Sequence, residues 1–283
     1  MTATGHLSDR IAAALTDLSP TPPRVGIVLG SGLAALEDRL EDRRRLDFGE
    51  VGLPSAGVAG HGGHYVVGRL RDVPVVVQAG RIHPYEGAAP TVVAAPVRAM
   101  AALGVSALIM TSAVGSLRST LEPGALVLLD DVLNVSFRAP LEGRFQAGDV
   151  VDAESPFPDM SAPFDPRLQA LALAVSAESG VELRRAVYAA VLGPAYETRA
   201  EVRLLARLGG DVVGMSTVSE TVVAAAVGLP LVALSVVTNF GTGLGEARLD
   251  HDDVLERGAR SAERAIDIVE GLVRRLEAQE APS

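Results

Sequence analysis

Short apolar runs alternate along this chain with stretches in which apolar residues recur at helical spacing. RVGIVLG at 24–30 is a short β-rich run that ends in glycine, and SGLAALEDRL at 31–40 then has the spacing of a helix. YVVGRL and VPVVVQA flank Arg71 and Asp72, which predicts a hairpin with a tight turn. The expected strands lie at 24–30, 65–70, 73–79, 106–112, 124–134, 182–193, 211–215 and 231–239.

Helical patterns fill the intervals between these strands, which places the chain in the α/β class. Because strands are apolar on both faces, they favour a twisted central sheet, mixed or mainly parallel, flanked by helices. No linker, repeat or low-complexity segment interrupts the pattern, so residues 1–283 are expected to form a single domain. The expected helices lie at 1–20, 31–40, 90–104, 166–179, from 197 onward, at 217–227 and at 251–278.

Two stretches depart from this simple alternation. The segment from Val135 to Pro166 is rich in Pro, Gly, Asp and Phe and has no steady period, which predicts a long ordered loop. Loops of this length in compact domains are usually functional or disordered. The apolar stretch 221–237 approaches the length of a membrane span, but Gly228 and Pro230 break it. It therefore fits a buried helix followed by a buried strand.

Composition narrows the function classes. The 283 residues are 48% hydrophobic and carry a net charge of −10, and all 25 basic residues are arginine. The acidic balance argues against nucleic acid or an anionic membrane as the main partner. The absence of lysine excludes a Walker-type phosphate loop and a Schiff base, and the absence of cysteine excludes disulfides and zinc–thiolate sites. The N-terminus predicts an amphipathic helix instead of a signal peptide, so we expect a cytoplasmic protein.

A glycine motif, GSGLAA at 30–35, lies where the first predicted strand meets a helix. Glycines let the backbone approach a ligand, and the first N–H groups of a helix can bind an anion. The motif also fits the dinucleotide fingerprint loosely, with Ala35 as its third small residue. Ser31 either donates to an anion or caps the helix. The motif alone leaves these alternatives open.

A second motif, QAGRIHPYEG at 78–87, ends an apolar strand abruptly. Period-two spacing places Arg81, His83 and Tyr85 on one side of an extended backbone, where they fit a polar, anionic ligand or an ordinary solvated strand end. His61 and His64 flank a glycine pair without a further metal ligand at suitable spacing. A loop position near an anion fits His61, and a surface position fits His64.

Further candidates lie at the ends of later strands or the starts of helices. Glu197 could complement a helix dipole, Ser216 could cap a helix, and the amide of Asn239 needs partners that a ligand can supply. Ligands bind at the carboxyl edge of open α/β sheets, where these residues are expected to lie. No serine–histidine–acid order or pair of catalytic carboxylates is evident in the sequence. The set suggests transfer between an anion and a base–sugar compound without a cofactor. Together with the candidates of the two earlier motifs, its members are Ser31, Arg81, His83, Tyr85, Tyr196, Glu197, Met215, Ser216, Asn239 and His251.

Seven motifs occur here in the order found in trimeric purine nucleoside phosphorylases: GSGL, the GH…G segment, QAGRIHPYEG, TSAVGSL, GPAYET, GMSTVSE and VVTNFGTGL. The chain resembles this family from about Val25 to Gly258. The resemblance implies a nucleoside phosphorylase fold and reversible phosphorolysis of 6-oxopurine ribo- or deoxyribonucleosides, such as inosine and guanosine. The products would be the free purine and the (deoxy)ribose 1-phosphate, as in purine salvage, with inorganic phosphate as a co-substrate and no cofactor.

The same resemblance implies a role for each matching position. The implied phosphate contacts are Ser31, His61, Arg81, His83, the backbone of Ala113, and Ser216. The implied purine contacts are Tyr196, Glu197 and Asn239. The implied ribose contacts are Tyr85, Met215 and His251, joined by Phe157 from a neighbouring subunit of a homotrimer. The implied catalytic residues are Asn239, Glu197 and His83.

Three departures and three alternatives accompany the resemblance. The family commonly has asparagine at Ser112 and glycine at Ala34, and often phenylalanine at Tyr196. Methylthioadenosine phosphorylases share the fold and usually have aspartate at Asn239, so they are the first alternative. The others are an NAD-binding oxidoreductase built on GSGLAA and a non-catalytic nucleoside-binding module.

Overall fold

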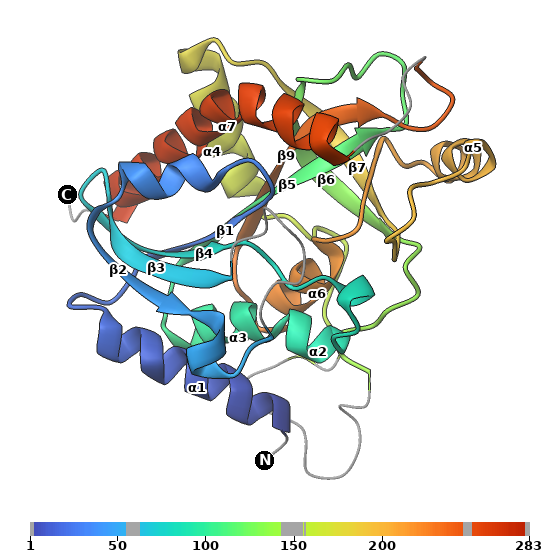
Figure 1. Cartoon of the computed structure of the whole chain (residues 1–283). Helices are drawn as coiled ribbons and strands as arrows, with labels where there is room; N and C mark the ends of the chain where they lie inside the picture. Colours follow the sequence, from blue (N-terminus) through green and yellow to red (C-terminus); the bar gives the residue numbers. More distant parts are fainter. Residues whose placement is uncertain (1–2, 55–62, 143–154, 156, 246–250, 281–283) are drawn as a thin grey trace.

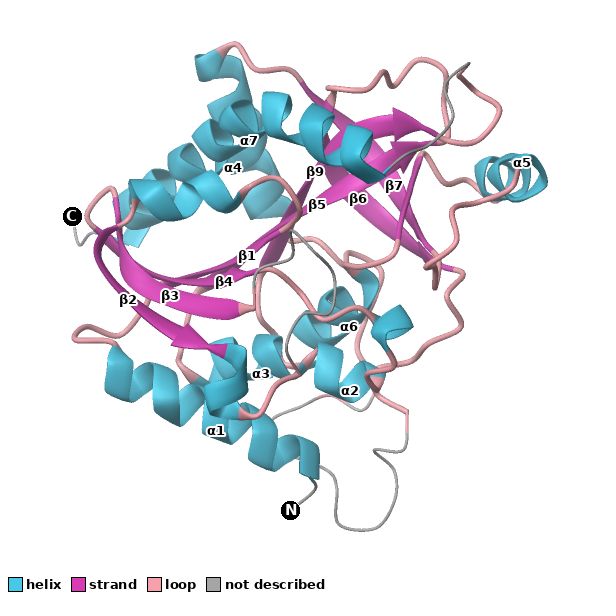
Figure 2. Cartoon of the chain, viewed as in Figure 1, coloured by secondary structure: helices cyan, strands magenta, loops and turns pink. Residues whose placement is uncertain are grey.

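The computed structural model describes residues 3–54, 63–142, 155, 157–245 and 251–280. In this part of the chain nine strands form one mixed sheet (Figure 1) with helices on both of its faces (Figure 2), which confirms the expected α/β class. The strands are β1 (Val25–Leu29), β2 (Glu41–Asp47), β3 (His64–Leu70), β4 (Val73–Ala79), β5 (Ala107–Ser116), β6 (Leu126–Asn134), β7 (Leu183–Ala190), β8 (Val212–Gly214) and β9 (Leu231–Phe240). The α-helices are α1 (Ala3–Leu18), α2 (Pro90–Val93), α3 (Ala95–Ala102), α4 (Pro166–Ser179), α5 (Arg199–Arg207), α6 (Val218–Ala226) and α7 (His251–Glu280).

The sheet has an open half and a closed half that share β5. In the open half the order is β2-β3-β4-β1-β5, and β1 pairs in parallel with both β4 and β5. In the other half β5 pairs with β8 and also with β9, so β5, β8, β7, β6 and β9 close into a ring. The carboxyl ends of β1, β4, β5 and β9 therefore meet near the join between the halves.

Two apolar layers hold the helices to the sheet. On one face α4 and α7 pack through residues such as Leu168 and Ile266, and on the other face α1, α3 and α6 pack through residues such as Ile11 and Val223 (Figure 1). These four side chains are completely buried. Burying an aliphatic side chain of this size contributes about 1.5–3 kcal/mol, so both layers fix the strand ends firmly.

The stretch 31–47 differs from the sequence prediction. Instead of an α-helix, Ala34–Arg39 forms a 3₁₀ helix, called η1, and the edge strand β2 follows directly. Six of the seven β2 residues are exposed, and the strand's sequence is EDRRRLD. The pattern could not predict this strand because charged residues at a sheet edge give no apolar alternation.

Two predicted helices begin or divide elsewhere. The helix expected at 90–104 is divided into α2 and α3 at Ala94. The helix expected from 197 begins at Arg199, because Thr198 caps it: the Thr198 hydroxyl accepts from the Glu201 amide, and the Glu201 carboxylate accepts from the Thr198 amide. The residue that complements this helix start is therefore Glu201, and Glu197 lies in the preceding loop.

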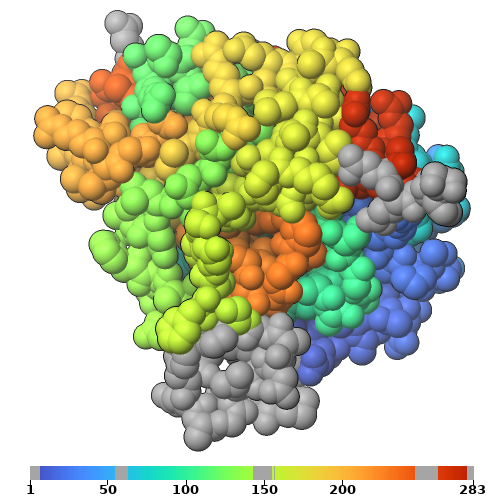
Figure 3. All heavy atoms as spheres, turned by 180° about the vertical axis from the view of Figure 1, so that it is seen from behind, coloured from blue at the N-terminus to red at the C-terminus, as the bar shows by residue number. Residues whose placement is uncertain are grey.

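The structure agrees with the predictions for the two stretches that depart from simple alternation, 221–237 and the segment after Asn134. The apolar stretch 221–237 is divided between α6 and β9, as expected, and no helix in the described part of the chain is long and apolar enough to cross a membrane. The described parts of 135–165 contain no helix or strand, which agrees with the predicted loop. Seen from behind, the segment that precedes α4 runs beside α6, which remains visible at the surface (Figure 3).

Candidate active site

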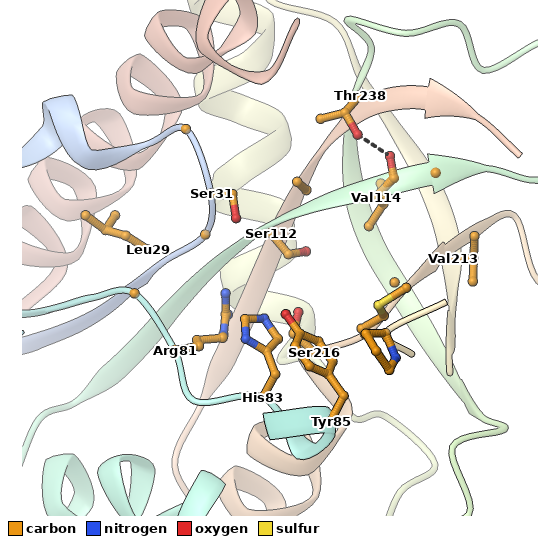
Figure 4. A pocket seen from close by; sticks show the side chains of 18 of the residues that line it. Leu29, Ser31, Arg81, His83, Tyr85, Ser112, Val114, Val213, Ser216 and Thr238 are labelled. Carbon is orange, nitrogen blue, oxygen red and sulfur yellow. Dashed lines mark hydrogen bonds between the residues drawn. The ribbon is translucent and has the colours of Figure 1, made fainter. Parts of the chain in front are cut away.

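A pocket of about 430 Å³ lies where the carboxyl ends of β1, β4, β5 and β9 meet. Side chains from loops far apart in sequence point into it from opposite sides: Arg81, His83 and Tyr85 follow β4, and Ser31 follows β1 (Figure 4). The predicted site residues that line this pocket are Ser31, Arg81, His83, Tyr85, Ala113, Tyr196, Glu197, Met215, Ser216 and Asn239.

Three predicted site residues are not among these. His61 lies outside the described residues, and although His251 begins α7, its side chain is outside the described part of the structure. Phe157 is described, but it does not line the pocket, and 80% of its surface is exposed.

Arg81 is the most firmly held cation in the pocket. Its side chain is buried, its Nε donates to Glu220 Oε1 at 2.8 Å, and its Nη1 donates to the carbonyl of Thr111 at 2.6 Å. No described group accepts a hydrogen bond from the buried Nη2. A buried N–H without an acceptor costs free energy, and an anion in the pocket can remove that cost.

A short 3₁₀ helix, η3 (Pro84–Glu86), orients the two aromatic rings beside Arg81. The Glu86 carboxylate accepts from the His83 amide at 2.8 Å and lies 3.1 Å from Nδ1 of the His83 ring. The rings of His83 and Tyr85 stack at a centroid distance of 4.9 Å. Burial, together with the nearby Glu86 and Tyr196, raises the pKa of Tyr85 to about 12, so its phenol stays protonated and can donate near neutral pH.

The glycine loop approaches β5 so closely that a side chain would not fit. The Gly30 amide donates to Thr111 Oγ1 at 2.9 Å, and the Thr111 hydroxyl donates in turn to the carbonyl of Val28 at 3.2 Å. A Cβ on Gly30 would lie 2.6 Å from the backbone of Ser112. Glycine at this position therefore lets Ser31 reach the pocket beside β5.

Ser216 is held at the entrance to α6 by an unusual turn and a buried tyrosine. Thr217 has φ 71° and ψ −50°, and the Val218 amide donates to the carbonyl of Ser216 at 2.8 Å, which makes a γ-turn centred on Thr217. The Ser216 amide donates to the hydroxyl of Tyr188 at 3.0 Å. Tyr188 can approach because Gly214 has no side chain to clash with its ring. Such strain is typical of ligand sites.

A carboxyl and an amide, those of Glu197 and Asn239, also line the pocket, and the Asn239 side chain lies against Gly115 of β5. Burial raises the pKa of Glu197 above that of an ordinary glutamate. Asn239 Nδ2 donates to the carbonyl of Phe240 at 3.0 Å, and Oδ1 accepts from the Thr238 hydroxyl at 2.9 Å. An amide offers two N–H donors and two lone pairs, so in these bonds Asn239 uses half of its capacity and keeps one donor and one acceptor for a ligand.

Comparisons with known proteins decide the family. The model of the phosphorylase superfamily matches residues 24–274. Purine nucleoside phosphorylase 1 of Geobacillus stearothermophilus is 38% identical over 95% of this chain and 97% of its own length, and that of Bacillus subtilis is 37% identical over 95% and 98%. The crystal structure of Schistosoma mansoni purine nucleoside phosphorylase in complex with inosine has a TM-score of 0.88 and 33% identity, covering 100% of this chain and 99% of that one.

The chain belongs to the purine nucleoside phosphorylase family. The family resemblance and the fold expected from the sequence are thereby confirmed. The pocket is the candidate active site of a phosphorylase. Two of the departures from the family pattern, Ser112 and Ala34, line this pocket. Ser112 is buried and its hydroxyl lies 2.6 Å from that of Ser235 on β9, so it ties two strands of the ring together. Ala34 begins η1 and lines the pocket.

The sequence pattern did not reveal one residue that lines this pocket, His64, or two that support residues lining it, Glu220 and Tyr188. The expectation that His64 lies at the surface is wrong: it is buried, lines the pocket, and its Nε2 lies 2.8 Å from the carboxylate of Glu37 on η1. No group of three or more metal-ligating side chains was found among the described residues. Glu220 and Tyr188 gave no local signal either, because each reaches its partner only through the fold.

Proposed function

We propose that this chain catalyses the reversible phosphorolysis of 6-oxopurine nucleosides, with inorganic phosphate as co-substrate and no cofactor. One observation carries the proposal: a single pocket is lined by Arg81, which has a buried N–H without an acceptor, and by a carboxyl and an amide, those of Glu197 and Asn239. The first group fits an anion, and the pair fits the edge of a purine. Inosine or guanosine would yield the free base and ribose 1-phosphate, and deoxyribonucleosides would yield deoxyribose 1-phosphate, which are steps of purine salvage.

The phosphate end would bind its dianion through charge-assisted hydrogen bonds. The side chains of Arg81, Ser31, Ser216 and His83 lie together at this end of the pocket (Figure 4). Ala113 would add its backbone amide, and His61 is a further proposed contact by resemblance. Hydrogen bonds to charged partners are about twice as strong as neutral ones, so this set suits phosphate.

The ribose would lie between the phosphate and purine ends. Tyr85 donates a phenolic O–H from one wall, and Met215 supplies an apolar surface on another. We place the sugar hydroxyls against Tyr85 and the 5′-hydroxyl near His251. This arrangement would leave C1′ of the ribose directed toward the bound phosphate.

The chemistry follows from how charge develops. Cleavage of the N-glycosidic bond builds positive charge on the ribose and negative charge on the departing purine. Bound phosphate stabilises the cation and attacks C1′, forming the C1′–O bond as the C1′–N9 bond breaks. Asn239 bonds the N7/O6 edge of the purine, which becomes more basic as the bond breaks, while Glu197 accepts from N1–H. Interactions that strengthen in this way lower the barrier more than they aid binding.

The same pair would set base specificity. A 6-amino purine has no N1–H for Glu197 and presents a donor where Asn239 would have to supply an acceptor. We therefore expect inosine and guanosine to react and adenosine or methylthioadenosine to react poorly. The Schistosoma mansoni relative was solved with inosine and also with adenosine, so turnover, and not binding, tests this preference.

We further propose a homotrimer in which each subunit completes its neighbour's site. Phe157 is 80% exposed although it is a large apolar residue, and it lies outside its own pocket. Light scattering should give three times the 29.3 kDa chain mass. The variant Phe157→Ala should raise the KM for inosine while the trimer persists. A monomer with full activity would contradict this assignment.

The deciding experiment is purine release from inosine by the purified protein with and without phosphate, with guanosine, adenosine and methylthioadenosine in parallel. We expect hypoxanthine and ribose 1-phosphate only when phosphate is present. Release without phosphate would indicate a hydrolase, and reaction of methylthioadenosine alone would favour that phosphorylase. Saturable inosine binding without turnover would indicate a binding module, and a fluorescence titration with NADH tests the oxidoreductase.

A further inference from the structure

Glu220 lies behind Arg81 and does not line the pocket, yet it is the only carboxylate among the described residues that is paired with this arginine. The two side chains are 4% and 5% exposed. Glu220 belongs to α6, and Arg81 follows β4, so the contact joins two segments 139 residues apart. The pair is therefore a buried ion pair that connects two walls of the site.

We propose that Glu220 is a positioning residue that fixes the orientation of the Arg81 guanidinium and thereby sets the affinity for inorganic phosphate. This inference rests on the proposed function of the pocket. A guanidinium is planar, and its N–H groups point in fixed directions. With Nε held by Glu220 and Nη1 held by the carbonyl of Thr111, the plane of the guanidinium is determined, and the directions of the two N–H groups on Nη2 are determined with it.

The position of Glu220 on α6 adds a second constraint. Ser216, which lines the phosphate end, precedes α6, and Glu220 lies in the first turn of that helix. The γ-turn at Thr217 connects them, and the Thr221 amide and hydroxyl both donate to the carbonyl of Thr217 at 2.9 Å. The segment that presents the serine hydroxyl therefore also anchors the arginine. We infer that Glu220 keeps these two phosphate-binding groups at a constant separation.

An electrostatic role and a positioning role of Glu220 predict opposite effects of substitution on phosphate binding, so the two roles can be distinguished. A carboxylate near an anion site repels the anion, so a purely electrostatic role predicts that neutralising Glu220 tightens phosphate binding. A positioning role predicts that the oxygen at Oε1 matters more than the charge. Glu220→Gln keeps an acceptor at full length but loses the charge, whereas Glu220→Asp keeps the charge but shortens the side chain by one methylene group.

The experiment compares these two variants with the wild-type protein. We expect Glu220→Asp to raise the KM for phosphate by about 10-fold or more, since hydrogen bonds to charged groups are the strong ones. Glu220→Gln should stay within about 3-fold of wild type. The KM for inosine should change little in either variant, because the purine end is not in contact with Glu220.

A second measurement does not depend on turnover. Inorganic phosphate should raise the Tm of the wild-type protein and of Glu220→Gln, because a ligand that binds the folded state stabilises it, and this rise should be much smaller in Glu220→Asp. Phosphate-dependent stabilisation without purine release would leave the role of Glu220 supported and would reject the proposed reaction.

Glu270 provides a matched control. It is also a buried carboxylate paired with arginine, at 3.1 Å from Arg39 and 2.8 Å from Arg71, but it lies on α7 outside the pocket. Glu270→Gln and Glu270→Asp should alter Tm without altering the response to phosphate. Tighter phosphate binding in Glu220→Gln would show an electrostatic role, and an unchanged phosphate KM in Glu220→Asp would overturn the proposal.

Discussion

At the proposed phosphate end of the pocket, Arg81 and Ser216 are held by partners from distant parts of the chain, whereas at the proposed purine end the side chain of Asn239 is held by its own neighbours. Arg81 bonds Glu220, 139 residues away, and Ser216 bonds Tyr188, 28 residues away. Among the described residues, the side chain of Asn239 bonds only the adjacent Thr238 and Phe240. The partners at the proposed phosphate end are therefore brought together only by the fold, whereas the side chain of Asn239 is held by residues next to it in the sequence.

The largest loss of kcat is expected from a substitution at the proposed purine end. Asn239→Ala removes the amide that would stabilise the departing purine, and loss of one such donor costs about 100- to 1000-fold in kcat. The measurement is steady-state phosphorolysis of inosine. Because the phosphate end is built separately, phosphate should still raise the Tm of this variant as it does in the wild type. A folded variant with near-wild-type turnover would refute the role given to Asn239.

The contrast between the two ends also explains what could be predicted from sequence. Arg81 and Glu197 lie just outside regular elements and Asn239 lies at the end of β9, so their pattern placed them at the edge of the sheet, and the structure brings them into one pocket. Glu220 lies inside a helix whose sequence gives no sign of a distant arginine, and Tyr188 is a buried residue inside β7. Long-range partners leave no local periodicity, so a single sequence does not reveal them.

The fold, like the site, could be predicted where it depends on local patterns and could not where it depends on long-range pairing. Apolar periodicity located the buried strands such as β1 and β9, because burial selects those residues directly. It missed β2, whose residues are charged, and it did not predict that β5 closes a ring by pairing with β9. Closure depends on register and twist over five strands, which the pattern of one strand does not encode.

The second prediction uses the pH dependence of kcat/KM to distinguish two carboxylates that are close in sequence, Glu197 and Glu201. Burial raises the pKa of Glu197, so on acidification this group gains its proton at a higher pH than an ordinary glutamate does. The proposed acceptor of N1–H must be ionised, so kcat/KM for inosine should fall as the pH drops through that raised pKa. Glu197→Gln should lower kcat/KM at neutral pH by about 10-fold and abolish this acidic limb.

The control for this profile is Glu201→Gln. Glu201 lies four residues away, but it caps α5 and its pKa is lowered by hydrogen bonds from the amide and hydroxyl of Thr198. Its substitution should retain the acidic limb. An identical limb in Glu197→Gln would show that another group controls the pH dependence.

The third prediction tests how tightly the phosphate end is built. In Gly30→Ala the added Cβ would lie 2.6 Å from Ser112 Cα and 2.7 Å from the carbonyl oxygen of Thr111, so the loop that carries Ser31 must move. Overpacking of this kind costs about 1–3 kcal/mol of unfolding free energy, which urea denaturation measures, and the KM for phosphate should rise as well. Gly49→Ala is the control, because a Cβ there meets nothing within 4 Å. Equal stability of the two variants would contradict the close approach at Gly30.

The smallest effect is expected from a single hydroxyl. Tyr188→Phe removes the acceptor for the Ser216 amide, so the serine is held less firmly and the KM for phosphate should rise by about 3- to 10-fold, the worth of one neutral hydrogen bond. Tyr65→Phe is a matched control: Tyr65 is equally buried, but its hydroxyl has no hydrogen-bond partner among the described residues. Removing an unpartnered buried hydroxyl should leave the phosphate KM unchanged. If both variants raised it equally, the loss would reflect general softening of the core, and the phosphate end would depend on its long-range partners no more than the purine end does.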